Sequence, residues 1–134
     1  MPKKGTIIEG IDIVDIGAKG KVIGKKDGQV YLCKEAVPGD VINLKVKRNR
    51  KGYIEGIVDS ITSYSPDRQE SRCAHFAYCG GCNWQNLGYE KQIQFKEKQV
   101  NQQLQRLGGF ESHEKLPILS SEEVYEYRNK LEFT

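Results

Sequence analysis

Apolar and polar residues alternate in short runs through the first sixty positions of the chain. Ile7, Ile11 and Ile13 are interleaved with acidic residues, and residues 41–48 place apolar side chains at every second position. A period of two is typical of strands with one buried face. This pattern predicts five strands, at residues 6–16, 21–25, 29–34, 41–48 and 53–61.

Turn signals separate the predicted strands. Asp27-Gly28 is a strong hairpin signal, Pro38-Gly39 favours a tight turn, and Lys51-Gly52 reverses the chain before the last run. Five short strands at near-regular spacing predict a small β-barrel of the oligonucleotide-binding type. A two-sheet sandwich would give a similar pattern, so this alternative stays open.

The pattern changes after this region. Residues 63–72 are polar and contain a proline, which is typical of a linker. Apolar residues then recur at helical spacing, and Gly108-Gly109 provides a stop, so we expect a helix over about residues 88–107. Residues 124–134 alternate again and predict a strand.

The fold class that follows is a mainly β N-terminal barrel, a cysteine-rich loop, one long helix and the first strand of a truncated α/β domain. We place the barrel at residues 1–62, the linker and cysteine loop at 63–86, and the start of the central domain at 87–134. We expect the helix's apolar stripe to pack as core, because such stripes usually do.

Charge is distributed unevenly between the two halves. The net charge is +3, but residues 1–62 carry 12 basic and 8 acidic residues, against 9 and 10 in residues 63–134. A basic first half is expected of a nucleic-acid-binding module. The sequence lacks an apolar signal region and a long apolar span, which predicts a cytoplasmic chain without membrane contact.

A basic run provides the candidate RNA-binding residues. Five cations lie within seven residues, at Lys45, Lys47, Arg48, Arg50 and Lys51. Clustered exposed cations release counterions when they contact phosphates. Two further candidates, Lys25 and Lys26, extend this patch if the barrel places both hairpins at one end. Tyr31 and Tyr53 are candidate platforms for base stacking, and the alternative for the whole run is a solvated hairpin tip.

Three cysteines in ten residues, Cys73, Cys79 and Cys82, are the candidate metal ligands. In a reducing compartment such a cluster indicates a metal site rather than disulfides, and thiolates select zinc or iron–sulfur clusters. A four-ligand site still lacks one ligand. The candidates for the fourth ligand are His75, Cys33 and a residue outside the chain. A redox-active pair of Cys79 and Cys82 is an alternative to a metal site.

Catalytic residues are not predicted in this chain. It has no glycine-rich phosphate loop after a strand, and no pair of carboxylates stands out. His113 has no evident nucleophile partner.

Two stretches resemble known families. Residues 10–61 resemble a TRAM domain, a small RNA-binding β-barrel, on Ile16-Gly17-Ala18-Lys19-Gly20, Asp27-Gly28 and Ala36-Val37-Pro38-Gly39-Asp40. The following segment is similar to the iron–sulfur segment of the RNA uracil-5 methyltransferases, with the pattern Cys73-x5-Cys79-Gly-Gly-Cys82-x-Trp-Gln-Asn-Leu-x-Tyr89-Glu90-x-Gln92. Tyr127-Arg128-Asn129-Lys130 resembles the strand that follows in the central domain of that family.

The resemblance implies a cofactor and an activity that extend beyond this chain. It implies a [4Fe–4S] cluster, with Cys73, Cys79 and Cys82 as three of four ligands and the fourth outside the chain. It also implies methyl transfer from S-adenosylmethionine to carbon 5 of a uridine, in a C-terminal domain beyond Thr134. That domain would supply a cysteine nucleophile for carbon 6 and a carboxylate base, so this fragment would not bind S-adenosylmethionine.

The predicted function is therefore that of the RNA-binding and iron–sulfur-binding portion of such a methyltransferase. The expected partner is structured RNA, with ribosomal RNA preferred to transfer RNA and a monomer preferred to an oligomer. Arg128 is a further RNA-contact candidate by resemblance. The alternative from a different class is a non-enzymatic RNA-binding module that binds zinc.

Overall fold

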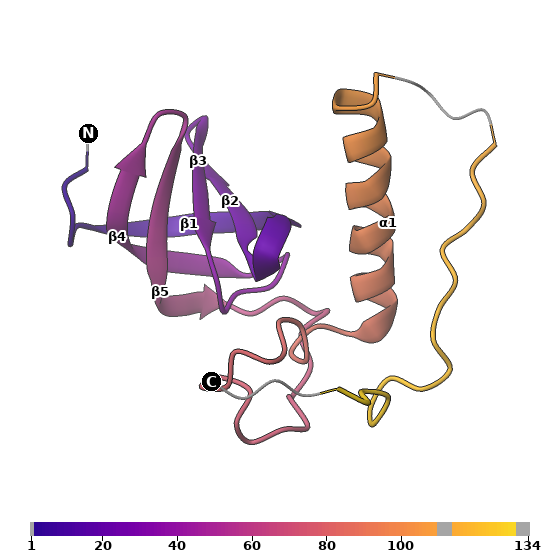
Figure 1. Cartoon of the computed structure of the whole chain (residues 1–134). Coiled ribbons are helices and arrows are strands. Elements are labelled where there is room, and N and C mark those ends of the chain that lie inside the picture. The colour runs from indigo at the N-terminus through magenta and orange to yellow at the C-terminus, as the bar shows by residue number, and fades with distance from the viewer. Residues whose placement is uncertain (1, 110–113, 131–134) are drawn as a thin grey trace.

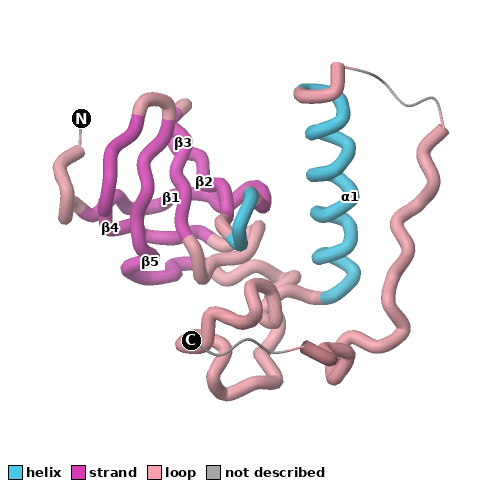
Figure 2. Tube along the Cα trace, in the orientation of Figure 1, coloured by secondary structure: helices cyan, strands magenta, loops and turns pink. Residues whose placement is uncertain are grey.

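Five strands close into a barrel in the first half of the chain (Figures 1 and 2). The computed structural model describes residues 2–109 and 114–130. The order around the barrel is β1-β2-β3-β5-β4, which confirms the predicted barrel and excludes the sandwich. The strands are β1 (Ile7–Ile16), β2 (Val22–Lys26), β3 (Gln29–Cys33), β4 (Val41–Arg50) and β5 (Tyr53–Ser63).

Closure depends on two pairings between strands that are distant in sequence. β1 pairs with β4 in antiparallel fashion, and β3 pairs with β5 in parallel. The remaining neighbours, β1–β2, β2–β3 and β4–β5, are antiparallel. The interior is filled by the apolar positions of the period-two pattern, and Ile11, Ile42 and Leu44 are fully buried.

A buried carboxylate joins the barrel to the segment that follows it. Asp40 is fully buried and accepts backbone N–H bonds from Val37 at 2.8 Å and Ser65 at 2.9 Å. Arg68 also donates to it, through Nη2 at 2.8 Å and Nε at 3.3 Å. Four donors compensate for the desolvation of the charge. Residues 65–68, which we expected to be part of a linker, are therefore bonded to the barrel.

The helix α1 (Tyr89–Arg106) matches the predicted helix closely, but its apolar stripe does not form a core. None of its described side chains is buried, and Val100 is 55% exposed. Lys98 of α1 bonds Asp15 of β1 at 2.7 Å. A short 3₁₀ turn, η1 (Ala18–Gly20), connects β1 to β2. No helix of the described residues has the length and apolarity to cross a membrane.

The strand predicted at residues 124–134 is wrong for its described part, residues 124–130, and its last four residues lie outside the described ones. Glu126 has a positive φ of 60°, which interrupts an extended backbone. The segment also has no strand beside it to pair with among the described residues. Instead, Arg72 Nη2 donates to Glu126 at 3.1 Å, and the Arg72 guanidinium lies 4.8 Å from the centre of the Tyr125 ring.

Candidate nucleic-acid interface

The parallel pairing of β3 with β5 brings two hairpin tips to one end of the barrel. Tyr31 of β3 is in register with Ile54 of β5, and each strand begins directly after its own turn. Because the two strands run in the same direction, Asp27-Gly28 and Lys51-Gly52 lie at the same end (Figure 1). Both hairpins are thus at one end of the barrel, which was the condition for Lys25 and Lys26 to extend the basic patch.

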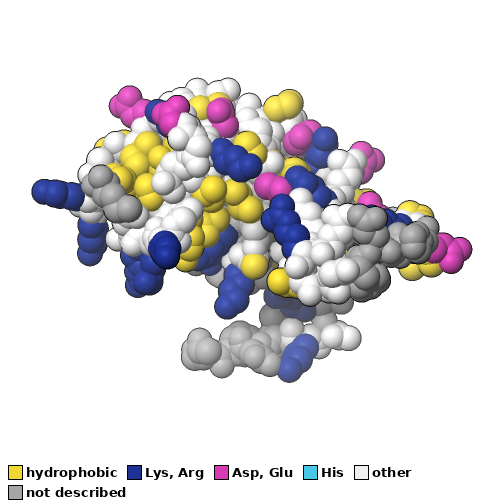
Figure 3. Space-filling model, turned by 90° about the horizontal axis from the view of Figure 1, so that it is seen from above, with side chains coloured by type: hydrophobic (Ala, Val, Ile, Leu, Met, Phe, Trp, Pro, Cys, Tyr) yellow, Lys and Arg dark blue, Asp and Glu magenta, His cyan; other side chains and the backbone are white. Residues whose placement is uncertain are grey.

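Most of the predicted RNA-binding cations are exposed at or near this end. Figure 3 looks down on the molecule and shows Lys and Arg side chains gathered along one side of the barrel, with acidic side chains along the other. Lys26 differs from the rest, because it is half-buried and its Nζ donates to the Glu9 carbonyl at 2.5 Å. The exposed members are Lys25, Lys45, Lys47, Arg48, Arg50 and Lys51.

A β-bulge sets which way the arginines face. The register between β4 and β5 shifts between Val46 and Arg48, after which Arg48 is opposite Glu55 and Arg50 is opposite Tyr53. Residues two apart on a strand share a face. The two arginines therefore lie on the same outer face of the barrel as Tyr53, whose side chain is half-buried.

The cations of this face lower the pKa of the Glu55 carboxylate. Lys21 Nζ bonds it at 2.5 Å, and this bond is the main reason that the pKa of Glu55 is lowered. The charges of Lys21, Arg48 and Arg50 lower that pKa further. A cation that the sequence analysis did not assign, Lys21, thus belongs to the same surface.

The two candidate stacking tyrosines point in opposite directions. Tyr31 is 6% exposed and packs in the barrel core, so its prediction as a base platform is wrong. Burial, followed by the nearby Asp27 charge, raises the pKa of Tyr31. Tyr53 lies at the outer surface, opposite Arg50 of the neighbouring strand, and remains a candidate for base stacking.

The three clustered cysteines lie in a loop that is closed at its base. We call residues 70–85 the cysteine loop. Gln69 N–H donates to the Asn86 carbonyl at 2.9 Å, and Gly88 N–H donates to the Asp67 carbonyl at 3.1 Å. The Gln85 side chain then accepts the Cys73 N–H at 3.2 Å. These bonds join the two ends of the loop, and the bonds of Ser65 and Arg68 to Asp40 connect the segment before it to the barrel.

The thiols of the cysteine loop are exposed and form no disulfide. Within residues 2–109 and 114–130, no three side chains of the His, Cys, Asp and Glu types are placed closely enough to hold one metal ion. The donor types suit a soft metal, but the loop as described does not hold them in a coordinating arrangement. Binding would require the loop to close around the metal.

Cys33 is unsuited to be the fourth ligand. It is 3% exposed in the barrel core, and burial raises the pKa of its thiol to about 12, with smaller contributions from Glu35 and Asp40. Cys33 is enclosed in the barrel core, whereas the other three cysteines are exposed on the loop, so this arrangement does not support the alternative that recruits Cys33. His75 is exposed within the cysteine loop, where its backbone carbonyl accepts the N–H groups of Tyr78 and Cys79.

Arg128 lies against the cysteine loop. Its Nη2 donates to the Gly81 carbonyl at 3.3 Å. With the Arg72–Glu126 ion pair, this bond holds the C-terminal segment against the loop. The contact was not predicted, because nothing local in the sequence links residues 47 positions apart.

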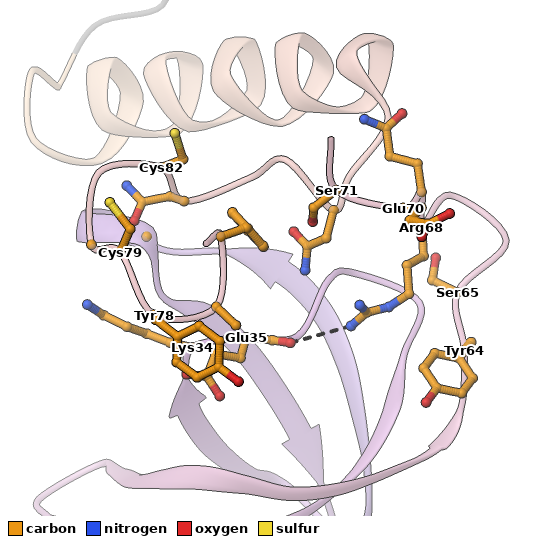
Figure 4. A pocket seen from close by; sticks show the side chains of 17 residues that line it. Lys34, Glu35, Tyr64, Ser65, Arg68, Glu70, Ser71, Tyr78, Cys79 and Cys82 are labelled. Atoms are coloured by element: carbon orange, nitrogen blue, oxygen red, sulfur yellow. Dashed lines mark hydrogen bonds between the residues drawn. The ribbon is translucent and has the colours of Figure 1, made fainter. Parts of the chain in front are cut away.

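A cleft of about 730 Å³ lies between the end of the barrel and the cysteine loop (Figure 4). The barrel contributes Gly20, Lys34 and Glu35, and the loop contributes Tyr78 and its neighbours. This site was not predicted from the sequence. The available signal was an aromatic side chain within each of two polar segments, at Tyr64 and Tyr78.

Comparison with curated proteins finds relatives along most of the chain. Proteins named as RNA methyltransferases match at 43% identity in Porphyromonas gingivalis and at 44% in Bacteroides thetaiotaomicron, over 92% and 89% of this chain. One from Chlorobaculum tepidum matches at 36% over 98% of it. The chain spans only 26–28% of the length of these relatives.

Among solved structures, the chain is similar to a Pyrococcus abyssi tRNA (uracil-54, C5)-methyltransferase in complex with S-adenosyl-L-homocysteine. The identity is 27%, the TM-score is 0.44, and the match covers 75% of this chain and 22% of that one. No protein-family model matches the chain. By sequence, then, the chain is related to proteins named RNA methyltransferases.

Proposed function

We propose that this relative of the RNA methyltransferases is the RNA-binding portion of an enzyme that methylates carbon 5 of a uridine, with ribosomal RNA as the preferred substrate. One observation carries the proposal: the basic outer face, which two hairpins and the bulged end of β4 build together. Uridine as the target base is what the resemblance of the segment from Cys73 to Gln92 to the RNA uracil-5 methyltransferases implies.

The basic face would bind the sugar–phosphate backbone. Its exposed cations come from two separate segments, Lys25 in β2 and residues 45–51 in β4 and its turn, so they can contact several phosphates along a strand rather than a single one. Half or more of the hydrogen bonds in nucleic-acid complexes go to the backbone and set orientation without reading sequence. The chain would thus position RNA for a reaction that other parts of the protein perform.

The methyl donor in this proposal is S-adenosylmethionine, held by a part of the enzyme that this chain does not span. The relatives are roughly four times as long as the matched region, so a catalytic domain has ample length there. The described residues supply no nucleophile–base pair of their own, and we assign them binding rather than chemistry.

We also propose that Cys73, Cys79 and Cys82 ligate a [4Fe–4S] cluster, with a fourth ligand from outside these residues. When bound, the cluster would serve as a structural cross-link. The support is the donor chemistry, namely three exposed thiols on a loop whose base is already joined. Metal binding would be coupled to closure of the loop.

Binding to a fluorescent RNA at several salt concentrations tests the RNA proposal. Each phosphate contact contributes about 0.7 to the slope of log K against log salt for a single strand. We expect a triple Lys47→Gln, Arg48→Gln, Arg50→Gln variant to weaken binding and reduce that slope by about 2. The matched control removes three exposed cations from the other half, Lys96, Arg106 and Lys115, and should have a smaller effect. Equal effects would contradict the assignment.

Anaerobic reconstitution tests the cluster proposal. We expect sub-stoichiometric iron with an absorption band near that of iron–sulfur clusters, lost in Cys79→Ser and kept in Cys33→Ser. One equivalent of tightly bound zinc, lost on His75→Ala, would instead favour the non-enzymatic zinc module.

A further inference from the structure

We infer that the cleft between the barrel and the cysteine loop binds an unpaired nucleobase of the RNA, with Tyr78 and Tyr64 as its stacking surfaces. This inference rests on the proposed RNA binding and specifies it. It adds a second base-contacting site to the basic face, whose cations would contact the backbone.

Two exposed aromatic rings lie at the cleft. Tyr78 is 90% exposed and Tyr64 is 67% exposed, and both line the cleft. Figure 4 shows them at different sides of it, so the rings offer separate stacking positions. The Arg68 guanidinium lies 5.5 Å from the centre of the Tyr64 ring, which leaves the other face of that ring for a base. Exposed aromatic side chains beside a groove are typical of single-strand binding, because every base has a face that stacks.

The charges within the cleft are balanced. Lys34 and Arg68 line it together with Glu35 and Glu70, and Arg68 is already paired with Asp40. The cleft therefore has no excess of positive charge to attract a phosphate. The uncharged part of a nucleotide, its base, is the group that suits this lining.

The polar groups that line the cleft suit the edge of a base. Gln69, Asn83 and Asn86 contribute amide groups. Asn86 is 6% exposed, and its Oδ1 has no hydrogen-bond partner among the described residues. With a volume of about 730 Å³, the cleft lies in the range of small-molecule sites, about 300–1,000 Å³.

The cleft is continuous with the basic face along the chain. β3 begins at the hairpin tip and ends at Cys33, and the next residue, Lys34, lines the cleft. Lys21, which bonds Glu55 on the basic face, directly follows Gly20 of the cleft lining. Five residues of strand span roughly 16 Å, so one short single strand can contact both places.

The test measures binding of a fluorescent oligouridine of about ten nucleotides, within the site size of such barrels. Stacking of one base is worth about 1–3 kcal/mol, or roughly a 5- to 150-fold loss in affinity. We expect Tyr78→Ala to lower affinity within this range without changing the salt slope, and Tyr78→Phe to keep nearly full affinity. The matched control is Tyr127→Ala, since Tyr127 is 66% exposed and does not line this cleft.

Two further readings keep the inference falsifiable. Cross-linking with 4-thiouridine should join RNA to peptides that contain residues 64–86, and exclusive cross-links to the hairpins would overturn it. A Tyr64→Ala, Tyr78→Ala double variant that folds and binds like the wild type would also overturn it. If the triple hairpin variant still weakens binding in that case, the proposed RNA binding stands without the cleft; if the wild type binds no RNA, both proposals fail.

Discussion

The two halves of the molecule use similar amounts of apolar sequence in different ways. In the barrel, about one strand residue in four is buried, and all but one of the buried apolar residues of the described chain lie between positions 11 and 54. The exception is Leu87, at the base of the cysteine loop. In the second half, α1 has an apolar stripe with no buried residue.

The difference shows that periodicity alone does not produce a core. A strand's apolar face is buried once the sheet closes on itself, because the opposite wall of the barrel supplies the packing surface. An amphipathic helix needs another element against its stripe. The second half is held instead by polar contacts at the base of the cysteine loop and by ion pairs such as Lys98–Asp15.

The largest expected contrast is in thiol reactivity, since the same residue type occurs in both halves. In chelator-treated protein, we expect Cys73, Cys79 and Cys82 to react quickly with a disulfide reagent, and Cys33 to react at least about a thousandfold more slowly. The reason is that burial raises the pKa of Cys33 to about 12, against about 8.5 for a free thiol. A Cys33→Ser control should leave the fast phase unchanged. Four equally fast thiols would contradict the contrast.

Next in size is the loss of the buried carboxylate. Asp40→Ala leaves Arg68 and two backbone N–H groups without their acceptor, so we expect unfolding in urea to show a loss of about 3–5 kcal/mol. The control is the exposed Arg72–Glu126 pair at 3.1 Å, where Glu126→Ala should cost less than about 1 kcal/mol. Similar losses in both variants would mean that Asp40 does not join the two halves.

A matched pair of leucines compares the cores directly. Leu44 is fully buried in the barrel, and Leu107 is 85% exposed at the end of α1. We expect Leu44→Ala to lower the free energy of unfolding by about 2–5 kcal/mol. Leu107→Ala should change it by no more than about 0.5 kcal/mol. A large loss at Leu107 would show that α1 is packed in solution.

The smallest expected effect is at Glu55, whose folded pKa is lowered by Lys21. Its contribution to stability is therefore present above its unfolded pKa of about 4.3 and disappears as the pH falls through the lowered folded value. For a pair of this kind the contribution is below about 1 kcal/mol. The free energy of unfolding, measured with urea at a series of pH values, should therefore fall less steeply at acid pH in Glu55→Gln than in the wild type. The same variant should bind RNA a few-fold more tightly, and Glu122→Gln, at an exposed position, should show neither effect.

The sequence predicted the parts of the fold that depend on near neighbours. Strand runs, the Asp27-Gly28 hairpin and the helix boundaries all follow from local periodicity and turn chemistry, and the structure confirms them. The opposite directions of Tyr31 and Tyr53 follow from strand registers, which a single sequence does not state. The cleft was missed for the same reason, since its lining comes from segments as distant as Gly20 and Asn86.

The wrong predictions have a related cause. The alternation over residues 124–130 is a true strand pattern, but a strand also needs a partner, and the backbone there turns at Glu126. The apolar stripe of α1 was likewise a valid pattern without a facing surface. In both cases the local pattern was interpreted correctly, but the tertiary contact that the predicted element needs is not formed among the described residues.

The buried Asp40 has a consequence for how the chain folds during synthesis. The hairpin of β2 and β3 can form as soon as it is made, because its partners are adjacent. Its strands can close into a barrel only after β5 appears, and the Asp40 charge is fully compensated only when Ser65 and Arg68 have followed. Pairings of high sequence separation form slowly. A ribosome that pauses between codons 54 and 68 would thus expose an open barrel with an unpaired edge, which is the stage at which a chaperone would have most effect.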